Sequence, residues 1–544
     1  MLRFILGFSL LLLASSASQA IVLQNDTSDV GSLSAAAVAT KMGSARHDYL
    51  NRNYRGALTT YREILKSEPN NSKALYRTAQ CYYELKRYEL AEEYLDKSVK
   101  IDPEVFDEVD FFYGKIAHRL AKLDEAIGHF NDYLATDPSE RSYEYFLTNR
   151  YIEQCQYAKE MMARPVDVEI ENMGRSINSR FDDYTPSITA NGKYLVFTSR
   201  RSDTKGGEID KEGDYKFYED VYYSKWDEEY DEWTLSENLK GNVNTDKYDA
   251  VLSIAPSGKE LFIYRNNESS AGDIFVSKYS EPTESWREPQ KMPKPINTSY
   301  FEGSVSITED GETLYFISER QGGMGRGDIY VSKKEKEGEW SKPENLGDII
   351  NTEDDEKFVY IHPNGRTLYF ASNGHQTMGS YDIFKSDFIN GQWSVPVNLG
   401  YPINTVNEES TFSLTKDNQT LLIAAEYDDS YGERDIYKID VSDYNFISGG
   451  YDQSNFSTLN LQVNDEEGEG LRKADVKIYN AISGRLITTE TTDTDGSLQI
   501  NLLGNQRYKV EAIFRRNEPT IKEFELPLND GGPAEMDLEV KIQT

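Results

Sequence analysis

Two different internal repeats, one after the other, constrain the fold of this 544-residue chain more than any other feature. In the first region, Ala57, Ala91 and Ala126 lie 34 and 35 residues apart, and prolines follow them at the same intervals. In the second region, a longer unit rich in tyrosine, valine and isoleucine recurs with spacings of 66, 53, 54 and 53 residues. A repeated unit buries its apolar face against its neighbours, so each region should form one stack or ring.

The first region, from about Met42 to Met162, has the pattern of paired helices. Each unit reads as helix, short turn, helix and then proline, as in "RYELAEEYLDKSVKIDP". Small residues let the two helices of a pair approach closely, and the proline ends the second helix. These units resemble the tetratricopeptide repeat family, which implies a helical domain over residues 35–163. Within it, Arg141 to Met162 is expected to be a capping helix.

The second region, residues 164–444, has the pattern of a β-propeller. Each unit supplies about four short strands, joined in several units by Asn-Gly or Asp-Gly turns, as in "SITEDGETLYFIS". The last unit lacks its outer strand, and the segment "PVDVEIENM" before the first unit supplies it, which closes the ring and removes exposed edges. We expect five blades, or six if the insertion between Arg201 and Glu219 contains strands; we interpret that insertion as a loop.

The propeller units resemble the WD-like repeats of the TolB propeller, in which a Ser-Pro-Asp-Gly-Lys turn precedes a strand. The best matches are Ala255 to Lys259 and His362 to Arg366, and the other three units lack the proline.

The C-terminal region is expected to be a small β-sandwich over residues 457–544, after a polar linker at 445–456. Seven strand-like runs, predicted to be antiparallel, fit in about 85 residues. The run "TTDTDGSLQINL" resembles the turn of carboxypeptidase-regulatory-like domains, with Leu498 in place of the usual aromatic residue.

The first 20 residues have the pattern of a secretory signal peptide, because Arg3 precedes a short apolar run and small residues follow it. The mature chain is expected to be soluble, and its net charge of −34 argues against nucleic acid as a partner. Cys81 and Cys155 fall two repeats apart, too far for a disulfide, and are expected to be buried free thiols.

The sequence contains no pattern of a reactive centre, and we predict that the protein is not an enzyme. There is no Gly-x-Ser-x-Gly motif, and the five histidines do not have metal-ligand spacing. We expect no cofactor and no bound metal. Turn residues that recur in every blade are interpreted as architectural, because a site needs only one copy.

The first helices of the helical repeats carry the candidate binding residues, since a tetratricopeptide array forms a groove lined by these helices. Aromatic side chains with interspersed cations suit protein recognition, and the alternative is that the tyrosines pack between repeats. The predicted lining residues are Arg46, Tyr49, Lys73, Tyr76, Gln80, Tyr83, Phe111, Lys115 and His118.

This order of domains resembles the PorE-type periplasmic proteins of Bacteroidetes, although an OmpA-like domain and a lipidated cysteine are absent. The resemblance implies a scaffold in the periplasm, associated with the outer membrane, that binds envelope proteins of type IX secretion or gliding; contact with peptidoglycan is in doubt. Two alternatives remain: a propeller that binds a glycan or peptide in its channel, and a glycan-cleaving enzyme with carboxylates converging at the channel mouth.

Overall fold

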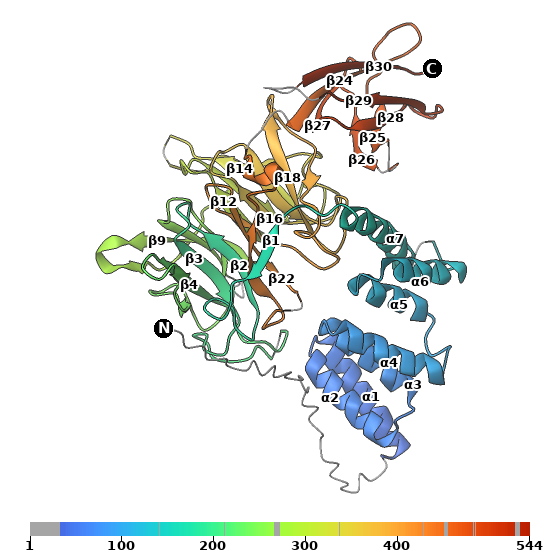
Figure 1. Cartoon of the computed structure of the whole chain (residues 1–544), viewed down its shortest axis with the longest axis vertical. Helices are drawn as coiled ribbons and strands as arrows, with labels where there is room; N and C mark the ends of the chain where they lie inside the picture. The colour runs from blue at the N-terminus through green and yellow to red at the C-terminus, as the bar shows by residue number, and fades with distance from the viewer. Residues whose placement is uncertain are drawn as a thin grey trace, which may run out of the picture.

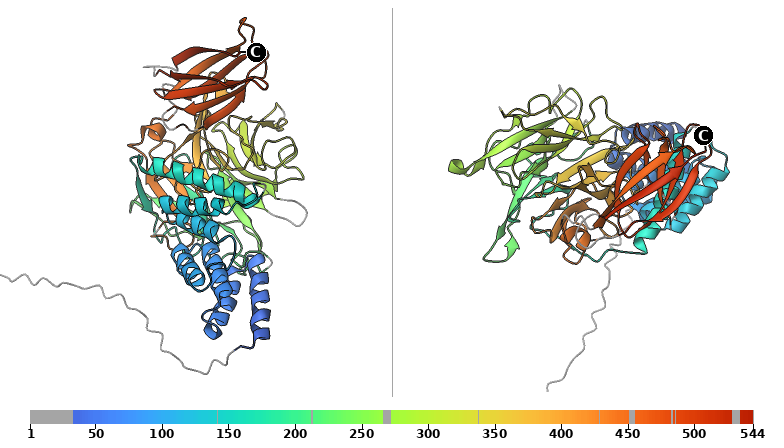
Figure 2. Two further views of the ribbon diagram at one scale, coloured as in Figure 1. Left: turned by 90° about the vertical axis from the view of Figure 1, so that its right-hand side faces the viewer. Right: turned by 90° about the horizontal axis from the view of Figure 1, so that it is seen from above.

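The computed structural model describes residues 33–543, except 141, 212, 266–271, 337, 428, 451–454, 482, 483, 485 and 528–533. The expected signal peptide lies outside these residues. The chain forms three parts in sequence order: a helical array, a ring of sheets and a small β-domain (Figure 1). The helical array lies against one side of the ring, and the small domain lies at one end of the molecule (Figure 2). Within the described residues, no helix is long and apolar enough to cross a membrane.

The helical array consists of three helix pairs and a final longer helix. Its helices are α1 (Ala35–Leu50), α2 (Tyr54–Ser67), α3 (Ser72–Glu84), α4 (Tyr88–Ile101), α5 (Val109–Arg119), α6 (Leu123–Ala135) and α7 (Tyr143–Met162). The second helix of each pair ends two or three residues before a proline. A Cβ atom on Gly114 would lie 2.5 Å from the Phe130 ring, so a small residue is required where α5 and α6 meet. Cys81 and Cys155 are buried and free, in separate clusters.

Five sheets form the ring, and each is one blade. The first contains β2 (Asp183–Ile188), β3 (Tyr194–Ser199), β4 (Asp220–Asp227), β5 (Glu232–Trp233) and β6 (Glu237–Asn238). The second contains β7 (Asp249–Ile254), β8 (Glu260–Arg265), β9 (Asp273–Ser280), β10 (Ser285–Trp286) and β11 (Gln290–Lys291). The third contains β12 (Glu302–Ile307), β13 (Thr313–Ser318), β14 (Asp328–Lys333) and β15 (Glu344–Asn345). The fourth contains β16 (Glu356–Ile361), β17 (Thr367–Ser372), β18 (Asp382–Ile389), β19 (Gln392–Trp393) and β20 (Val397–Asn398). The fifth contains β1 (Glu169–Asn172), β21 (Ser413–Leu414), β22 (Thr420–Ala425) and β23 (Asp435–Asp440).

The N-terminal strand of the propeller completes its last blade, as the sequence predicted. Strand β1 pairs antiparallel with β23, from Glu169 opposite Asp440 to Asn172 opposite Tyr437. In the described part of the insertion between Arg201 and Glu219, only an isolated bridge between Ile209 and Phe217 forms. The prediction of a five-bladed propeller is therefore confirmed, and the alternative of six blades is wrong.

A buried asparagine after the outer edge of each blade holds that edge to the third strand. Its side-chain amide accepts a hydrogen bond from one backbone N–H and donates to the carbonyl of the same residue, at 2.7 to 3.1 Å. We call these residues the asparagine latches: Asn178, Asn244, Asn297, Asn351 and Asn404. Asn178 precedes the first blade but binds Ile436 of the fifth, so it reinforces ring closure.

The segment predicted to be a linker begins as part of the propeller. Helix α8 (Asn445–Ser448) buries Ile447 in the core between the fourth and fifth blades. The Phe446 and Gly450 carbonyls accept hydrogen bonds from the fully buried ammonium of Lys385, which also pairs with Asp387 at 3.1 Å. A buried cation needs such partners, and the nearby chain supplies them.

The C-terminal domain is a sandwich of seven strands in two sheets. One sheet has the order β27 (Ser497–Leu503), β24 (Phe456–Asn464), β30 (Ala534–Lys541), and the other has β26 (Leu486–Thr491), β25 (Asp475–Asn480), β28 (Arg507–Ile513), β29 (Thr520–Glu525). The prediction of only antiparallel strands is wrong, because β24 and β30 pair in parallel. The intervening strands supply the long crossover that a parallel pair requires. The sandwich joins the fourth blade, where Val395 enters its core and donates its N–H to the Asn501 carbonyl.

We predict that the substitution Asn351→Ala lowers the free energy of unfolding by about 1–3 kcal/mol, because it leaves the buried N–H of Ile329 without a partner and removes one of the two donors to the Ile329 carbonyl. Urea unfolding and amide exchange at Ile329 measure the effect. The exposed Asn70 is the control, and Asn70→Ala should change the free energy of unfolding by less than about 0.5 kcal/mol. Equal effects of the two substitutions would contradict the role of the latch.

Candidate functional site

The candidate binding surface is the face of the first helices α1, α3 and α5. Equivalent positions recur along this face, with Tyr49, Tyr83 and His118 at one level. The structure places the nine predicted residues in three groups. Arg46 and Lys73 are exposed; Tyr49, Gln80, Tyr83 and Lys115 are partly buried; Tyr76, Phe111 and His118 are buried.

The three buried residues are corrections to the predicted groove, because packing removes them from the surface. Tyr76 packs against Phe106 and Phe112 within the second and third repeats, with ring centroids 4.5 and 5.5 Å apart. This is the alternative in which a tyrosine packs between repeats. Phe111 and His118 are covered instead by parts of the chain far away in sequence.

The last helix and a propeller loop together cover the third repeat. Tyr151 of α7 contacts Phe111 and His118, with ring centroids 6.2 and 5.5 Å apart. Met378 and Val406 of the propeller belong to the same buried cluster as Phe111. The exposed part of the predicted groove therefore lies mainly on the first two repeats, with Lys115 of the third repeat at its border.

Hydrogen bonds fix the helical array to the propeller at this junction. Arg119 donates to the Val406 carbonyl and, at 2.9 Å, to Ser380 Oγ. The buried Gln154 donates to Thr377 Oγ1 at 2.8 Å and to the Gly379 carbonyl at 2.5 Å. His118 Nε2 lies 2.9 Å from the Met378 carbonyl oxygen, so Nε2 carries the proton. The buried Nδ1 has no hydrogen-bond partner among the residues that the structure describes. The sequence offered no signal for these contacts, because they join residues more than 200 positions apart.

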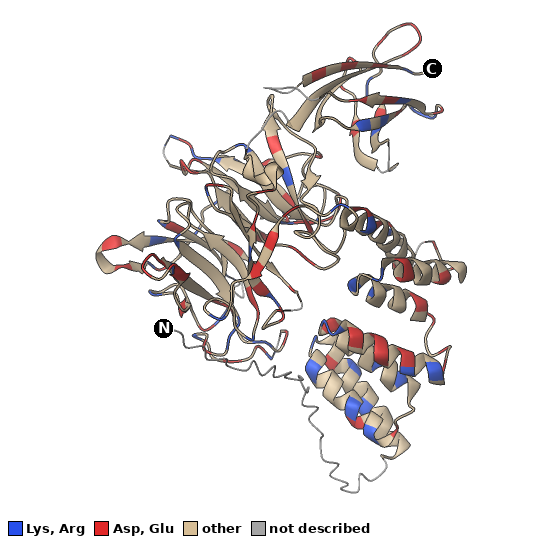
Figure 3. Cartoon of the chain, viewed as in Figure 1, with Lys and Arg blue, Asp and Glu red and all other residues tan. Residues whose placement is uncertain are grey.

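The exposed part of the face combines aromatic rings with charges of both signs. Lys115 Nζ lies 4.5 Å from the centre of the Tyr83 ring. The Tyr49 hydroxyl donates to Glu84 at 3.3 Å, and burial is the main cause that raises the pKa of Tyr49. Arg46 of α1 and Lys73 of α3 are exposed, and Figure 3 shows several Lys and Arg residues on the helical array. Such a surface can bind a peptide through ring contacts and carboxylate-ammonium pairs.

The central channel of the propeller contains a hollow of about 280 Å³, which is lined by the innermost strands. The carboxylates at this end of the channel already have partners. Glu219 accepts a hydrogen bond from the Tyr184 hydroxyl, Asp182 pairs with Lys216 at 2.7 Å, and Glu408 pairs with Lys357 at 2.5 Å. Burial raises the pKa of Glu219. Burial alone would also raise the pKa of Glu408, but the charges of nearby cations, chiefly Lys357, outweigh it and lower this pKa to about 2.

One cluster among the described residues has metal-ligand types within reach of one another. Ligand atoms of Asp110, His129 and Asp132 lie within 4.8 Å of one another. All three side chains are at least partly exposed, and the His129 ring stacks on Tyr113 with centroids 4.9 Å apart. Exposed acidic groups of this kind occur commonly without an ion. The expectation of no metal stays a prediction.

Comparison with known proteins identifies the helical repeats. A model of the tetratricopeptide repeat family matches residues 43–105. The sequence has no match among the curated proteins.

Several solved structures have a similar fold over part of the chain. TolB from Acinetobacter baumannii is 15% identical, over 49% of this chain and 56% of that chain, with a TM-score of 0.29. An alpha-L-arabinofuranosidase from Podospora anserina, in complex with cellotriose, is 15% identical over 50% and 92%, with a TM-score of 0.30. The Sgt2 tetratricopeptide domain from Aspergillus fumigatus is 17% identical over 25% and 89%, with a TM-score of 0.22. Similarity at this level carries no inference about a ligand.

We predict that acid weakens the junction between the helical array and the propeller through His118. Burial, and secondly Arg119, lower the pKa of His118 to about 3, below the value of about 6.5 for an exposed histidine. The stabilising contribution is therefore complete above about pH 6.5 and is lost as the pH falls toward 3. In urea unfolding between about pH 6 and about pH 4.5, His118→Gln should reduce the slope of the free energy of unfolding against pH by about 1.4 kcal/mol per pH unit. An unchanged slope would contradict this assignment.

We also predict that Arg119→Ala loosens the junction without unfolding either part, because the buried Val406 carbonyl loses its donor. Small-angle scattering should show a larger radius of gyration, and proteolysis between residues 163 and 168 should become faster. Arg62→Ala, on the exposed side of α2, is the matched control and should change neither measurement. An Arg119 variant that behaves like the control would show that this contact does not hold the two parts together.

Proposed function

We propose that this chain is a non-catalytic scaffold that binds segments of other proteins on its tetratricopeptide repeats. The observation that carries the proposal is the exposed face of the first two repeats, where Tyr49, Tyr83, Arg46 and Lys73 remain accessible while the third repeat is fixed to the propeller. A binding face held on a large rigid ring can position its partner relative to whatever contacts the rest of the ring.

The charge of this face supports an acidic partner segment. The chain has 59 lysines and arginines against 93 acidic residues, so exposed cations are scarce. Arg46 and Lys73 are exposed on this face, and the Lys115 ammonium lies over the Tyr83 and Phe111 rings. Carboxylates of a bound segment would find ammonium and guanidinium groups here, on a chain in which acidic residues predominate.

We further propose that the protein acts in the periplasm at the outer membrane, as an adaptor of type IX secretion or gliding. The expected signal peptide and the resemblance of the domain order to PorE-type proteins support this proposal. Its partners would then be envelope proteins of that machine.

A glycan-cleaving enzyme is the second candidate, because Glu219 and Glu408 near the channel differ in pKa in the direction that a general acid and a carboxylate base require. The hydrogen bond from Tyr184 to Glu219 and the ion pair of Glu408 with Lys357 favour a structural role. A hydrolase screen with envelope and plant glycans, using Glu219→Gln as the control, separates these roles. Turnover that Glu219→Gln abolishes would establish the enzyme.

We predict that the double variant Arg46→Glu/Lys73→Glu captures its envelope partner at least 10-fold less well, with an unchanged melting temperature, because both side chains are exposed. A photo-crosslinker at position 73, followed by mass spectrometry in intact cells, identifies the partner. The same crosslinker at Arg62, on the second helix of the first pair, is the control. Equal yields of the same partner from positions 62 and 73 would rule out this face as the binding surface.

A further inference from the structure

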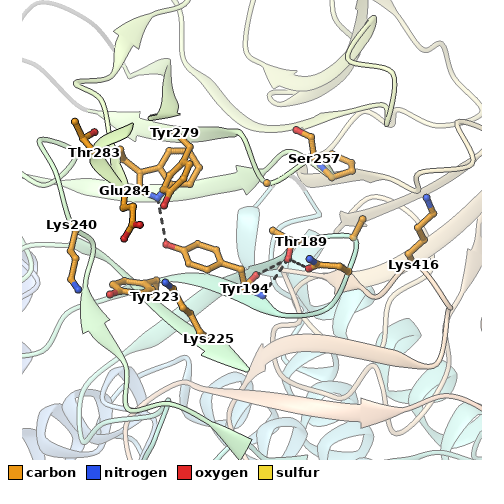
Figure 4. A pocket seen from close by; sticks show the side chains of 15 residues that line it. Thr189, Tyr194, Tyr223, Lys225, Lys240, Ser257, Tyr279, Thr283, Glu284 and Lys416 are labelled. Atoms are coloured by element: carbon orange, nitrogen blue, oxygen red, sulfur yellow. Dashed lines mark hydrogen bonds between the residues drawn. The ribbon is translucent and has the colours of Figure 1, made fainter. Parts of the chain in front are cut away.

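A crevice of about 720 Å³ lies between the first and second blades, at the end of the ring where their first and second strands join. Figure 4 shows the side chains that line it. Its aromatic residues are Tyr194, Tyr223, Tyr279 and Trp286. The volume lies in the range of pockets that bind small ligands or peptide side chains, about 300–1,000 Å³.

Comparison of the blades shows that two of these aromatic residues are particular to the first blade, although both contribute to the core there. Tyr194 begins the second strand of its blade, and the other four blades have Glu260, Thr313, Thr367 and Thr420 there. Tyr223 is the fourth residue of the third strand, where the other blades have Val276, Val331, Lys385 and Lys438. A residue that the architecture required would recur, so this pair of tyrosines points to a role specific to the first blade.

The aromatic rings pack on one another and leave edges and hydroxyl groups toward the crevice. The Tyr194 and Tyr223 rings stack with centroids 5.5 Å apart and an angle of 23°. Trp286 Nε1 donates to the Tyr194 hydroxyl at 3.4 Å, and Trp286 is only 3% exposed. A sugar ring needs a free aromatic face, whereas a crevice between ring edges suits an inserted apolar side chain.

The shape of the crevice is set by the backbone beneath it. Gly241 has a φ of +116°, and a Cβ atom there would lie 2.2 Å from the Trp286 carbonyl oxygen. This close approach joins the first blade to the second at the base of the aromatic cluster. The site is therefore preformed, which reduces the entropy lost when a ligand binds.

The charges around the crevice favour an anionic ligand. Three lysines line it, Lys225, Lys240 and Lys416, against one acidic residue, Glu284. Lys240 lies 3.5 Å from Glu237, and Lys416 pairs with Glu309. Lys225 is exposed, and no carboxylate among the described residues lies within ion-pair distance of its ammonium. The Lys225 ammonium is therefore available to a carboxylate of a ligand, on a chain whose net charge is −34.

We propose that this crevice binds an acidic peptide segment, which inserts one aromatic or large aliphatic side chain between Tyr194, Tyr223 and Tyr279 and places carboxylates beside Lys225 and Lys240. The site is independent of the helical face. The two ends of strand β22 show where the two surfaces lie. Lys416, just before the strand begins, lines the crevice. Glu426, directly after the strand ends, pairs with Lys86 of the helical array at 2.9 Å. The two binding surfaces therefore lie at opposite ends of the ring and can be occupied together.

The test measures binding of four fluorescein-labelled peptides, Asp-Glu-X-Asp-Glu with X as Phe, Tyr, Trp or Leu, to the mature chain by fluorescence anisotropy. At least one should bind with a dissociation constant below about 1 mM and weaken as NaCl rises from about 50 to about 500 mM. Lys225→Glu/Lys240→Glu should weaken binding at least 10-fold. Lys333→Glu is the matched control, because Lys333 is exposed at the equivalent position of the third blade, outside the crevice, and it should leave binding unchanged.

Tyr194→Thr and Tyr223→Val test the aromatic part of the site with residues that other blades use at the same positions, so the fold should be retained. Each should weaken peptide binding at least 10-fold with an unchanged circular dichroism spectrum. The proposal is overturned if none of the four peptides binds, or if Lys333→Glu weakens binding as much as the double variant. It is also overturned if cellohexaose binds, if Tyr194→Thr abolishes that binding, and if the peptides do not compete with cellohexaose. The variants Arg46→Glu/Lys73→Glu should leave this binding intact, which separates its failure from failure of the helical face.

Discussion

The asparagine latches are the interaction on which the rest of this structure depends. Four of the five blades end in outer strands of only two residues, and the outer strand of the fifth blade, β1, has four, so each outer edge holds few ladder hydrogen bonds. A buried side-chain amide that satisfies both the N–H and the C=O of one residue replaces part of that ladder. Because Asn178 makes the same contact with the fifth blade, the ring closes through the latch as well as through the pairing of β1 with β23.

A closed ring gives the helical array and the sandwich fixed places to dock. The third helix pair and α7 pack on propeller loops through Phe111, Gln154 and Met378, and the sandwich core accepts Val395 of the fourth blade. As a consequence, the propeller and α7 cover the third of the three repeats, and less of the helical face is available to bind a partner. The gain is that the exposed face of the first two repeats and the crevice between the first two blades have defined positions relative to each other.

Much of the fold could be predicted from the sequence, because repetition makes the local rules visible several times. The spacing of Ala57, Ala91 and Ala126, the strand supplied by the start of the propeller and the count of five blades all follow from that periodicity. The candidate site was harder to predict. His118 lies at the same level of the helical face as Tyr49 and Tyr83, yet it is buried under Met378, and no pattern near His118 distinguishes it. Alignment of the five units would have shown that Tyr194 and Tyr223 depart from the other blades.

The sequence alone determined the kinds of unit, their number and their order, since helix pairing and strand pairing within a unit depend on residues close together in the chain. The tertiary structure decided which surfaces remain exposed. Burial of Phe111 and His118, inclusion of α8 in the propeller and assembly of the crevice from two blades each join segments distant in sequence. Long-range packing of this kind depends on three-dimensional shape complementarity, which local periodicity does not encode.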